Sequence, residues 1–159
     1  MTQATDQAPT RGRYFEEFEV GFEATTPART ITETDVVNFA ALTGDWNPLH
    51  TDVEFARTTV FGQRIAHGLL VLSIASGLIT RLGLIEGTAE AFRELSWKFR
   101  APVFIGDTIH AVATVTEARP LPRLNSGMVI LEVSVINQRG EVVQKGTWQA
   151  LVKRRPVED

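Results

Sequence analysis

The 159-residue chain predicts an α+β fold in which a curved antiparallel sheet wraps around one long helix. One apolar segment, about 68–82, has the length of a buried helix and contains interleaved small residues. Four segments typical of β-strands follow it, at about 91–100, 107–118, 126–137 and 141–153. The chain is long enough for one domain with a real hydrophobic core, so the economical assembly places the helix against the sheet.

The N-terminal region contributes an irregular arm and a first strand. Residues 1–13 lack periodicity, so we expect a disordered arm ahead of a single domain over residues 14–155. A strand is expected from about Phe22 to Ile31. Pro27 should interrupt it, because proline cannot donate a ladder hydrogen bond.

Helical signals come next. Thr32 is a capping residue and Asp35 places an acid in the first turn, while Gly44 is a suitable C-terminal stop. The segment 45–50 is therefore expected to be a loop, in which Pro48 prevents the helix from continuing. A second, short helix is expected at about 53–57.

The strand segments show the alternation of a half-buried sheet. One face of the 107–118 segment carries Ile109, Ala111, Ala113 and Val115, and Asn137 to Gly140 is a tight-turn candidate between the last two strands. A curved sheet around one helix is the hot-dog architecture. A single copy leaves sheet edges and a flank of the helix uncovered, so a homodimer or a dimer of dimers is expected.

Composition excludes several classes of protein. The formal net charge of −3 gives no sign of a nucleic-acid-binding surface. The chain has no cysteine, which excludes disulfides, thiolate metal sites and a thiol nucleophile. The N-terminus lacks the apolar core of a signal peptide, and the run Gly68 to Ile79 is too short to span a bilayer. We therefore expect a cytoplasmic protein without a nucleic-acid or membrane partner.

The stretch from Phe39 to His50 carries the chemistry. Asp45 and His50 are separated by four loop residues, so both side chains can point into one pocket. A carboxylate and an imidazole so placed can hold one water between them and move its protons. The alternative is structural, because Asp, Asn and Pro are also the residues that form turns. In that case Asp45 and Asn47 cap turns, and His50 is a packed side chain.

This stretch resembles the signature of the MaoC-like, (R)-specific enoyl-CoA hydratase family. That signature runs from an aromatic residue through Gly-Asp-x-Asn-Pro-aliphatic-His to a small residue six positions after the histidine. The matching residues are Phe39, Gly44, Asp45, Asn47, Pro48, Leu49, His50 and Ala56. Segments 13–18, 65–70 and 100–108 also look like family elements, so the similarity covers nearly the whole chain after the arm.

The resemblance implies a hydro-lyase that reversibly hydrates a trans-2-enoyl-CoA to an (R)-3-hydroxyacyl-CoA. Asp45 would act as the base toward the attacking water, and His50 would position that water and deliver a proton at C2. Asn47 matches a position that holds the loop. Coenzyme A enters as part of the substrate, so no cofactor is expected, and no metal site is expected either.

The start of the long helix supplies further candidates. Gly68 matches the oxyanion position of the family, where a backbone N–H meets the thioester oxygen, although tight helix packing also favours a glycine. Ser76 is expected either to support the site by a hydrogen bond or to bond to its own helix. His67 can cap the helix or contact the substrate, but a structural role is favoured.

Two rival functions remain open on the sequence. A hot-dog thioesterase generally carries a carboxylate on or near the central helix, whereas residues 69–82 contain no Asp or Glu. A non-catalytic acyl-thioester binding subunit is the second rival, although this chain keeps every polar position of the motif. A serine nucleophile is unsupported, because the sequence has no Gly-x-Ser-x-Gly elbow.

Overall fold

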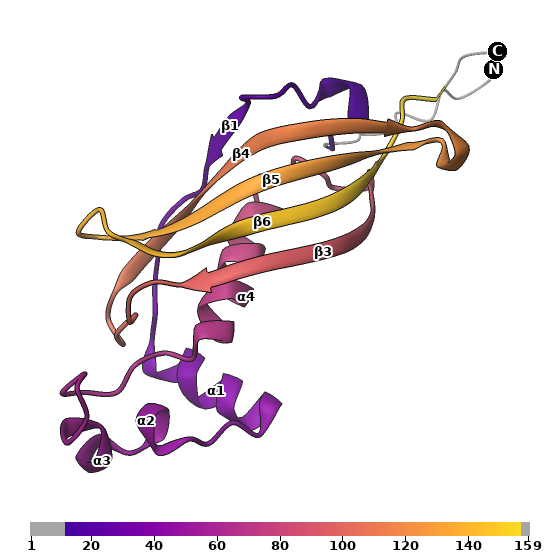
Figure 1. Ribbon diagram of the computed structural model, residues 1–159. Coiled ribbons are helices and arrows are strands. Elements are labelled where there is room, and N and C mark those ends of the chain that lie inside the picture. Colours follow the sequence, from indigo (N-terminus) through magenta and orange to yellow (C-terminus); the bar gives the residue numbers. More distant parts are fainter. Residues whose placement is uncertain (1–11, 157–159) are drawn as a thin grey trace, which may run out of the picture.

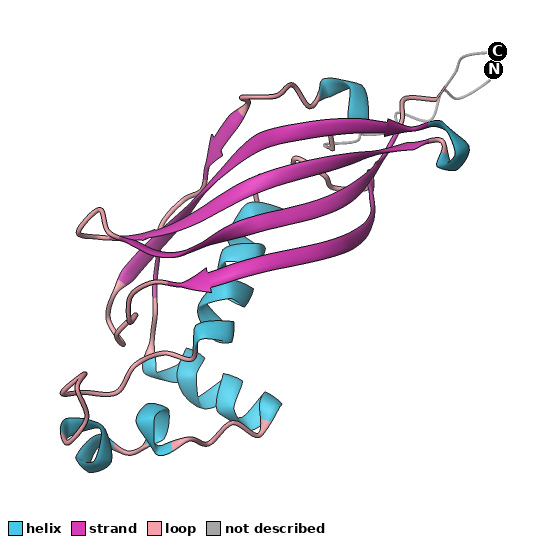
Figure 2. Cartoon of the chain, viewed as in Figure 1, coloured by secondary structure: helices cyan, strands magenta, loops and turns pink. Residues whose placement is uncertain are grey.

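The computed structural model describes residues 12–156. Its elements, in chain order, are the 3-10 turn η1 (Phe15–Glu17), strands β1 (Glu23–Thr25) and β2 (Arg29–Thr30), helices α1 (Glu33–Thr43), α2 (Pro48–Thr51), α3 (Val53–Arg57) and α4 (Gly68–Thr80), strands β3 (Ala89–Phe99) and β4 (Thr108–Leu121), the 3-10 turn η2 (Pro122–Leu124), and strands β5 (Ser126–Asn137) and β6 (Val142–Lys153). Figure 1 shows their arrangement, and Figure 2 separates helices from strands by colour.

The sheet is antiparallel throughout, with strand order β1-β4-β5-β6-β3, and β2 also pairs with β4. Strands β4, β5 and β6 are consecutive neighbours, whereas β3, which precedes them in sequence, pairs with β6 at one edge. Helix α4 lies against one face of the curved sheet, and α1, α2 and α3 extend beyond it (Figures 1 and 2). The predicted α+β hot-dog fold is confirmed.

The hydrophobic core lies between α4 and the sheet. Helix α4 contributes Val71 and Ala75, both fully buried, and Val133 and Val135 of β5 face it, also at 0% exposure. The predicted apolar face of β4 is confirmed, because all four of its residues are buried. The opposite flank of α4 is exposed, as expected for one copy, and includes Leu69 at 59% exposure.

The predicted boundaries hold for most elements. Thr32 and Asp35 form a reciprocal capping box at the start of α1, and Gly44 ends that helix with a left-handed φ of 77°. The strand interruption near Pro27 is confirmed, because β1 and β2 are separate short strands. Residues 1–11 of the expected arm lie outside the described residues, whereas the Arg13 N–H donates to the Leu84 carbonyl at 2.7 Å.

One local prediction was wrong. Pro48 does not keep the 45–50 segment irregular; it begins α2, where its missing N–H costs no intrahelical hydrogen bond. The Asn47 side chain caps this turn by accepting from the Leu49 N–H at 2.9 Å. His50 therefore lies in a helical turn rather than a loop. Helix α4 also ends at Thr80, two residues before the expected Leu82.

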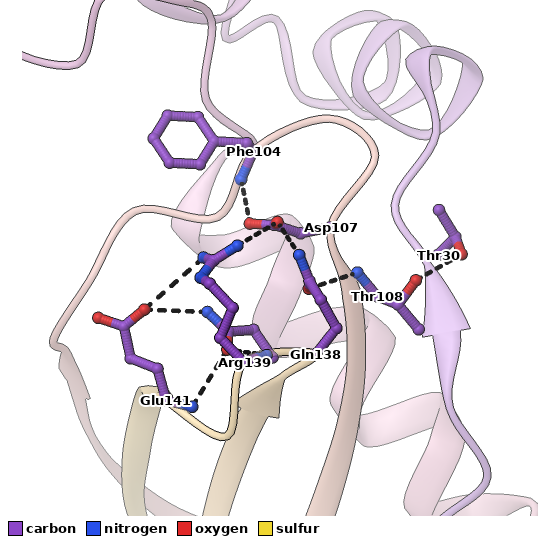
Figure 3. Close-up of polar contacts among 8 residues, drawn as sticks. Thr30, Phe104, Asp107, Thr108, Gln138, Arg139 and Glu141 are labelled. Atoms are coloured by element: carbon purple, nitrogen blue, oxygen red, sulfur yellow. Dashed lines mark hydrogen bonds and ion pairs between the residues drawn. The ribbon is translucent and has the colours of Figure 1, made fainter.

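A polar network around Asp107 ties the tip of the β5–β6 hairpin to the segment before β4 (Figure 3). The Asp107 carboxylate is 5% exposed and accepts from the Phe104 N–H at 2.9 Å. It also accepts from Gln138 Nε2 at 2.6 Å and from the Arg139 guanidinium at 3.1 Å. The Gln138 carbonyl in turn accepts from the Thr108 N–H at 3.0 Å.

Burial alone would raise the pKa of the Asp107 carboxyl, but hydrogen bonds from Gln138, Phe104 and Arg139 outweigh it, so its pKa lies below the ordinary value. A carboxyl with a depressed pKa stabilises the fold above the pKa of the unfolded chain, about 3.9. That stabilisation is lost as the pH falls through the lower pKa of the folded state. Asp107 therefore contributes to stability at neutral pH.

We predict that Asp107→Asn lowers the free energy of unfolding at pH 7 by about 2–3 kcal/mol, because a buried, charge-assisted acceptor is lost. Guanidinium unfolding of both proteins measures the difference, which should shrink below about pH 4. Glu132→Gln is the matched control, because Glu132 forms a solvent-exposed ion pair with Lys145. Equal stability of Asp107→Asn and wild type at pH 7 would contradict the prediction.

Candidate functional site

The structure brings the two residues of the predicted pair together and adds a third. Asp45 directly follows Gly44 at the end of α1, His50 lies in α2, and His67 precedes α4. The Asp45 carboxylate and the two imidazoles each offer one atom, and these three atoms lie within 4.8 Å of one another. The left-handed Gly44 turns the chain, and the Asn47 cap then shapes α2, so local geometry aims both ends of the motif at one point.

A backbone hydrogen bond determines the tautomer of His50. Its Nδ1 lies 2.7 Å from the Ile65 carbonyl oxygen. Because a carbonyl oxygen only accepts, Nδ1 carries the proton and Nε2 keeps its lone pair in the neutral ring. His50 can therefore accept a proton, or a hydrogen bond from water, at Nε2.

The surroundings of His50 keep the imidazole neutral. Burial is the main cause that lowers the pKa of His50, and the neighbouring His67 lowers it further. The hydrogen bond with the Ile65 carbonyl and the Asp45 carboxylate act in the opposite direction, but the pKa remains below the ordinary value. At neutral pH the ring is thus an acceptor rather than a cation.

The Ile65 carbonyl is itself held in place. Ile65 forms a β-bridge with Phe104, and the Ala66 N–H donates to the Val103 carbonyl at 2.8 Å. Phe104 is the residue whose N–H donates to Asp107 (Figure 3). The Asp107 network therefore supports the backbone that orients His50.

His67 contacts the backbone of Asp45 and the rings of His50 and Phe39. It is 2% exposed, and its Nε2 lies 2.9 Å from the Asp45 carbonyl oxygen. Its ring lies 3.9 Å from the His50 ring and 5.0 Å from the Phe39 ring, centroid to centroid. The side chain makes no capping bond to α4, and its Nδ1 has no hydrogen-bond partner within residues 12–156. This arrangement supports the favoured structural role rather than capping.

Asp45 and Asn47 differ in what they do. Asp45 is exposed, and its carboxylate accepts from the Asn47 N–H at 3.3 Å. The side-chain oxygen of Asn47 accepts the capping hydrogen bond of α2, which is the loop-holding role expected for this residue. Asp45 thus keeps carboxylate lone pairs available for a water or a substrate, whereas Asn47 acts on the backbone.

A cavity of about 490 Å³ opens beside His50, between the start of α4, the end of β3 and the segment after it. Its lining is mostly apolar, and consists of His50, Phe61, Ile65, Ala66, Gly68, Leu69, Val71, Phe99, Arg100, Ala101, Pro102, Val103 and Gln144. Ser76 is not among these residues. It lies on the exposed flank of α4, away from the cavity wall, and a supporting role for Ser76 stays a prediction.

Gly68 begins α4 at the cavity wall. No side chain caps this helix, so the N–H groups of its first turn donate no hydrogen bond to a capping side chain. A Cβ added to Gly68 would lie 2.7 Å from the Phe99 ring. The glycine is therefore needed for packing, which is the alternative named above, and it also lines the cavity.

Sequence reasoning missed Gln144. This residue of β6 is 2% exposed and lines the cavity beside Gly68. The one available signal was a polar residue directly after Val142 and Val143, which is too common to single out a site.

The three clustered groups at Asp45, His50 and His67 are also of the types that bind metals. Two of their ring nitrogens already contact backbone carbonyls, at Ile65 and at Asp45. A metal would have to use the remaining nitrogens, one of which is the buried Nδ1 of His67. The absence of a metal from the site stays a prediction.

Comparison with known proteins agrees with this geometry. The family described as MaoC like domain matches residues 18–137. An (R)-specific enoyl-CoA hydratase of Rhodospirillum rubrum is 38% identical over 143 residues, which cover 89% of this chain and 93% of that protein.

Two solved structures are also similar. A monoamine oxidase regulatory protein from Archaeoglobus fulgius superposes with a TM-score of 0.86 at 43% identity, covering 91% of this chain and 97% of that one. The R-hydratase from Pseudomonas aeruginosa superposes with a TM-score of 0.76 at 31% identity, covering 92% of each chain. With the fold and most of its length matched in both sequence and structure, the chain belongs to the MaoC-like dehydratase family.

Proposed function

We propose that this protein catalyses the reversible addition of water to a trans-2-enoyl-CoA, which yields an (R)-3-hydroxyacyl-CoA. One observation carries the proposal: one atom of the Asp45 carboxylate and one nitrogen of the His50 imidazole lie within 4.8 Å of each other, and His50 also lines the apolar cavity. The relatives named as hydratases match nearly the whole chain. An apolar cavity suits an acyl chain, and two acceptors side by side suit a water molecule.

The two acceptors determine how the water is used. A water between Asp45 and His50 donates one hydrogen to the carboxylate and one to Nε2, which leaves an oxygen lone pair for C3 of the enoyl group. As the C3–O bond forms, one water proton passes to the pair and the C2=C3 electrons move toward the thioester oxygen. The pair then returns one proton to C2, so that one molecule of water is added overall.

The charge on the thioester oxygen needs a donor. The Gly68 N–H at the start of α4 supplies one, and the helix dipole favours negative charge there. Loss of such a donor typically costs roughly 10²–10³-fold in rate. The acyl chain would lie along the apolar wall formed by residues such as Val71 and Val103.

The thioesterase alternative has less support. Helix α4 contains no Asp or Glu, the residue types that a hot-dog thioesterase generally carries on or near this helix. Within residues 12–156, none of the helices combines the length and the hydropathy needed to cross a bilayer. A cytoplasmic location stays a prediction.

We also propose that the working unit is a homodimer or a dimer of dimers. Strand β3 is an edge strand, and its Phe92, Leu95 and Phe99 are 58%, 41% and 57% exposed. An uncovered edge strand of this length, with exposed apolar side chains, is a surface for pairing. A second copy of the chain, which carries the same edge, is the simplest partner.

Substitution of the pair is the direct test of the reaction. We predict that Asp45→Asn and His50→Gln each lower kcat/KM for crotonyl-CoA hydration by about 10²–10⁴-fold, because each removes one acid–base group. The double variant should lose little more, since the two groups act as a unit. Loss of the absorbance of the conjugated thioester measures the rate.

Asp52→Asn is the matched control, because Asp52 caps α3 and asparagine caps equally well. Its activity should stay near that of wild type. Release of free thiol from acyl-CoA, seen with a thiol-reactive dye, would instead favour the thioesterase. Tight binding of thioesters with no turnover would favour the non-catalytic subunit.

The electrostatics of the pair can be measured without substrate. We predict that the NMR titration of His50 gives a pKa below the ordinary value of about 6.5, because burial disfavours the charged ring. Asp45→Asn should lower this pKa further, since the carboxylate favours the imidazolium. The chain has 3 histidines, so single substitutions assign the signals. A rise of the pKa in Asp45→Asn would contradict the assigned geometry.

The assembly is tested by sedimentation. We predict that wild type sediments at twice the 17.6 kDa chain mass or more, and that Leu95→Asp shifts it toward the monomer, because a charge then lies on the β3 edge. Val20→Asp is the control, since Val20 is 66% exposed and precedes β1 at the other side of the sheet. A monomeric wild type would refute the proposed assembly.

A further inference from the structure

We propose that Gln144 is a positioning residue, which fixes the first turn of α4 and with it the Gly68 N–H. The inference rests on the proposed hydration at this site, in which that N–H meets the thioester oxygen. Gln144 is 2% exposed, and a buried side-chain amide in an apolar cavity wall costs free energy unless it is hydrogen-bonded. Its partners therefore show what it does.

Both ends of the Gln144 amide are used. Its Oε1 accepts from the indole Nε1–H of Trp97 at 2.9 Å, and its Nε2 donates to the Gly68 carbonyl oxygen at 3.0 Å. An indole only donates and a carbonyl only accepts, so the amide cannot be flipped without losing both bonds. Trp97 therefore orients the amide, and the amide holds the carbonyl of the residue whose N–H faces the thioester.

The neighbouring strand pairs make this contact specific. Trp97 lies opposite Gly146 in the β3–β6 register, and a Cβ on Gly146 would come within 2.6 Å of the indole and overlap the Ser96 carbonyl. Phe99 lies opposite Gln144, and its ring fills the space beside Gly68. The helix start is thus held by a hydrogen bond from β6 and by an aromatic ring from β3.

The first turn of α4 depends on such external support. His67 gives it no side-chain cap, and the residues before it are held through the Ala66 hydrogen bond to Val103. Gln144 adds a directional contact within the helix itself, on the peptide unit next to the Gly68 N–H. A small displacement of a catalytic donor lowers the rate steeply, whereas it changes binding of the rest of the substrate little.

The first test is Gln144→Leu, which keeps the volume and removes both hydrogen bonds. We expect kcat for crotonyl-CoA to fall by roughly 10–100-fold, with KM changed by less than about threefold. Val129→Ala is the control, because Val129 is buried in a separate cluster with Phe18 and Val152. It should lower Tm without the fall in kcat. An unchanged kcat in Gln144→Leu would overturn the proposal.

A second variant separates the two hydrogen bonds. In Gln144→Glu the ionised carboxylate still accepts from Trp97 but has no hydrogen for the Gly68 carbonyl, whereas the protonated carboxyl has one. The activity of this variant relative to wild type should therefore rise as the pH falls. His50 and Arg100 are the ionisable side chains in the described lining of the cavity, so dividing by the wild-type profile removes their titration. A flat ratio would contradict the donor role.

The Trp97 link has its own matched pair of variants. Trp97→Phe should lower kcat in the same direction as Gln144→Leu, and the double variant should show less than the product of the two effects. Trp148→Phe is the control, because the buried Trp148 indole N–H has no partner within the described residues. Full additivity of Trp97→Phe with Gln144→Leu would contradict the proposed link from Trp97 through Gln144 to Gly68.

A readout without turnover keeps this inference distinct from the proposed function. In Gln144→Leu the backbone amide signals of Gly68 and Leu69 should shift and their hydrogen exchange should become faster. Unchanged signals would overturn the positioning role. If wild type hydrates no enoyl thioester, the proposed function fails, and the amide signals still decide whether Gln144 fixes the helix start.

Discussion

One hydrogen bond, between His50 Nδ1 and the Ile65 carbonyl, connects the parts of this site. It fixes the tautomer, and so decides which ring nitrogen is an acceptor. The carbonyl is held by the β-bridge from Ile65 to Phe104, and Phe104 is held by Asp107. The tautomer of the His50 ring is therefore linked to the buried Asp107 carboxylate, which does not line the cavity.

In the proposed mechanism the helices supply the reacting groups, and the sheet orients them. Asp45, His50 and Gly68 come from the helical segments, whereas the side chains that hold them in register, Asp107 and Gln144, lie just before β4 and on β6. Short helices such as α2 have little stability of their own, because one turn forms few hydrogen bonds. An extended sheet is the more rigid frame, so a site on short helices gains precision from contacts with it.

Sequence reasoning predicted what is local and missed what is long-range. The cap at Thr32, the stop at Gly44 and the strand alternation follow from neighbouring residues, and all three were confirmed. Pro48 was misread because the same residue ends one helix and begins another, and only its neighbours in space decide which. Gln144 lies 76 residues from Gly68, so no local pattern could reveal their hydrogen bond. An apolar helix likewise does not show in its own sequence which flank remains uncovered, so the exposure of Ser76 could not be predicted.

The surface that one copy leaves uncovered adjoins the cavity. Leu69 and Phe99 both line the cavity, yet they are 59% and 57% exposed. In the proposed mechanism, water that reaches this wall would weaken the hydrogen bond from the Gly68 N–H to the developing charge, because a high dielectric screens it. A partner that covers the β3 edge would remove the exposed edge and also exclude water from the cavity. Phe99 would then contribute both to pairing and to catalysis, because its ring fills the space beside Gly68 and is also exposed at the surface.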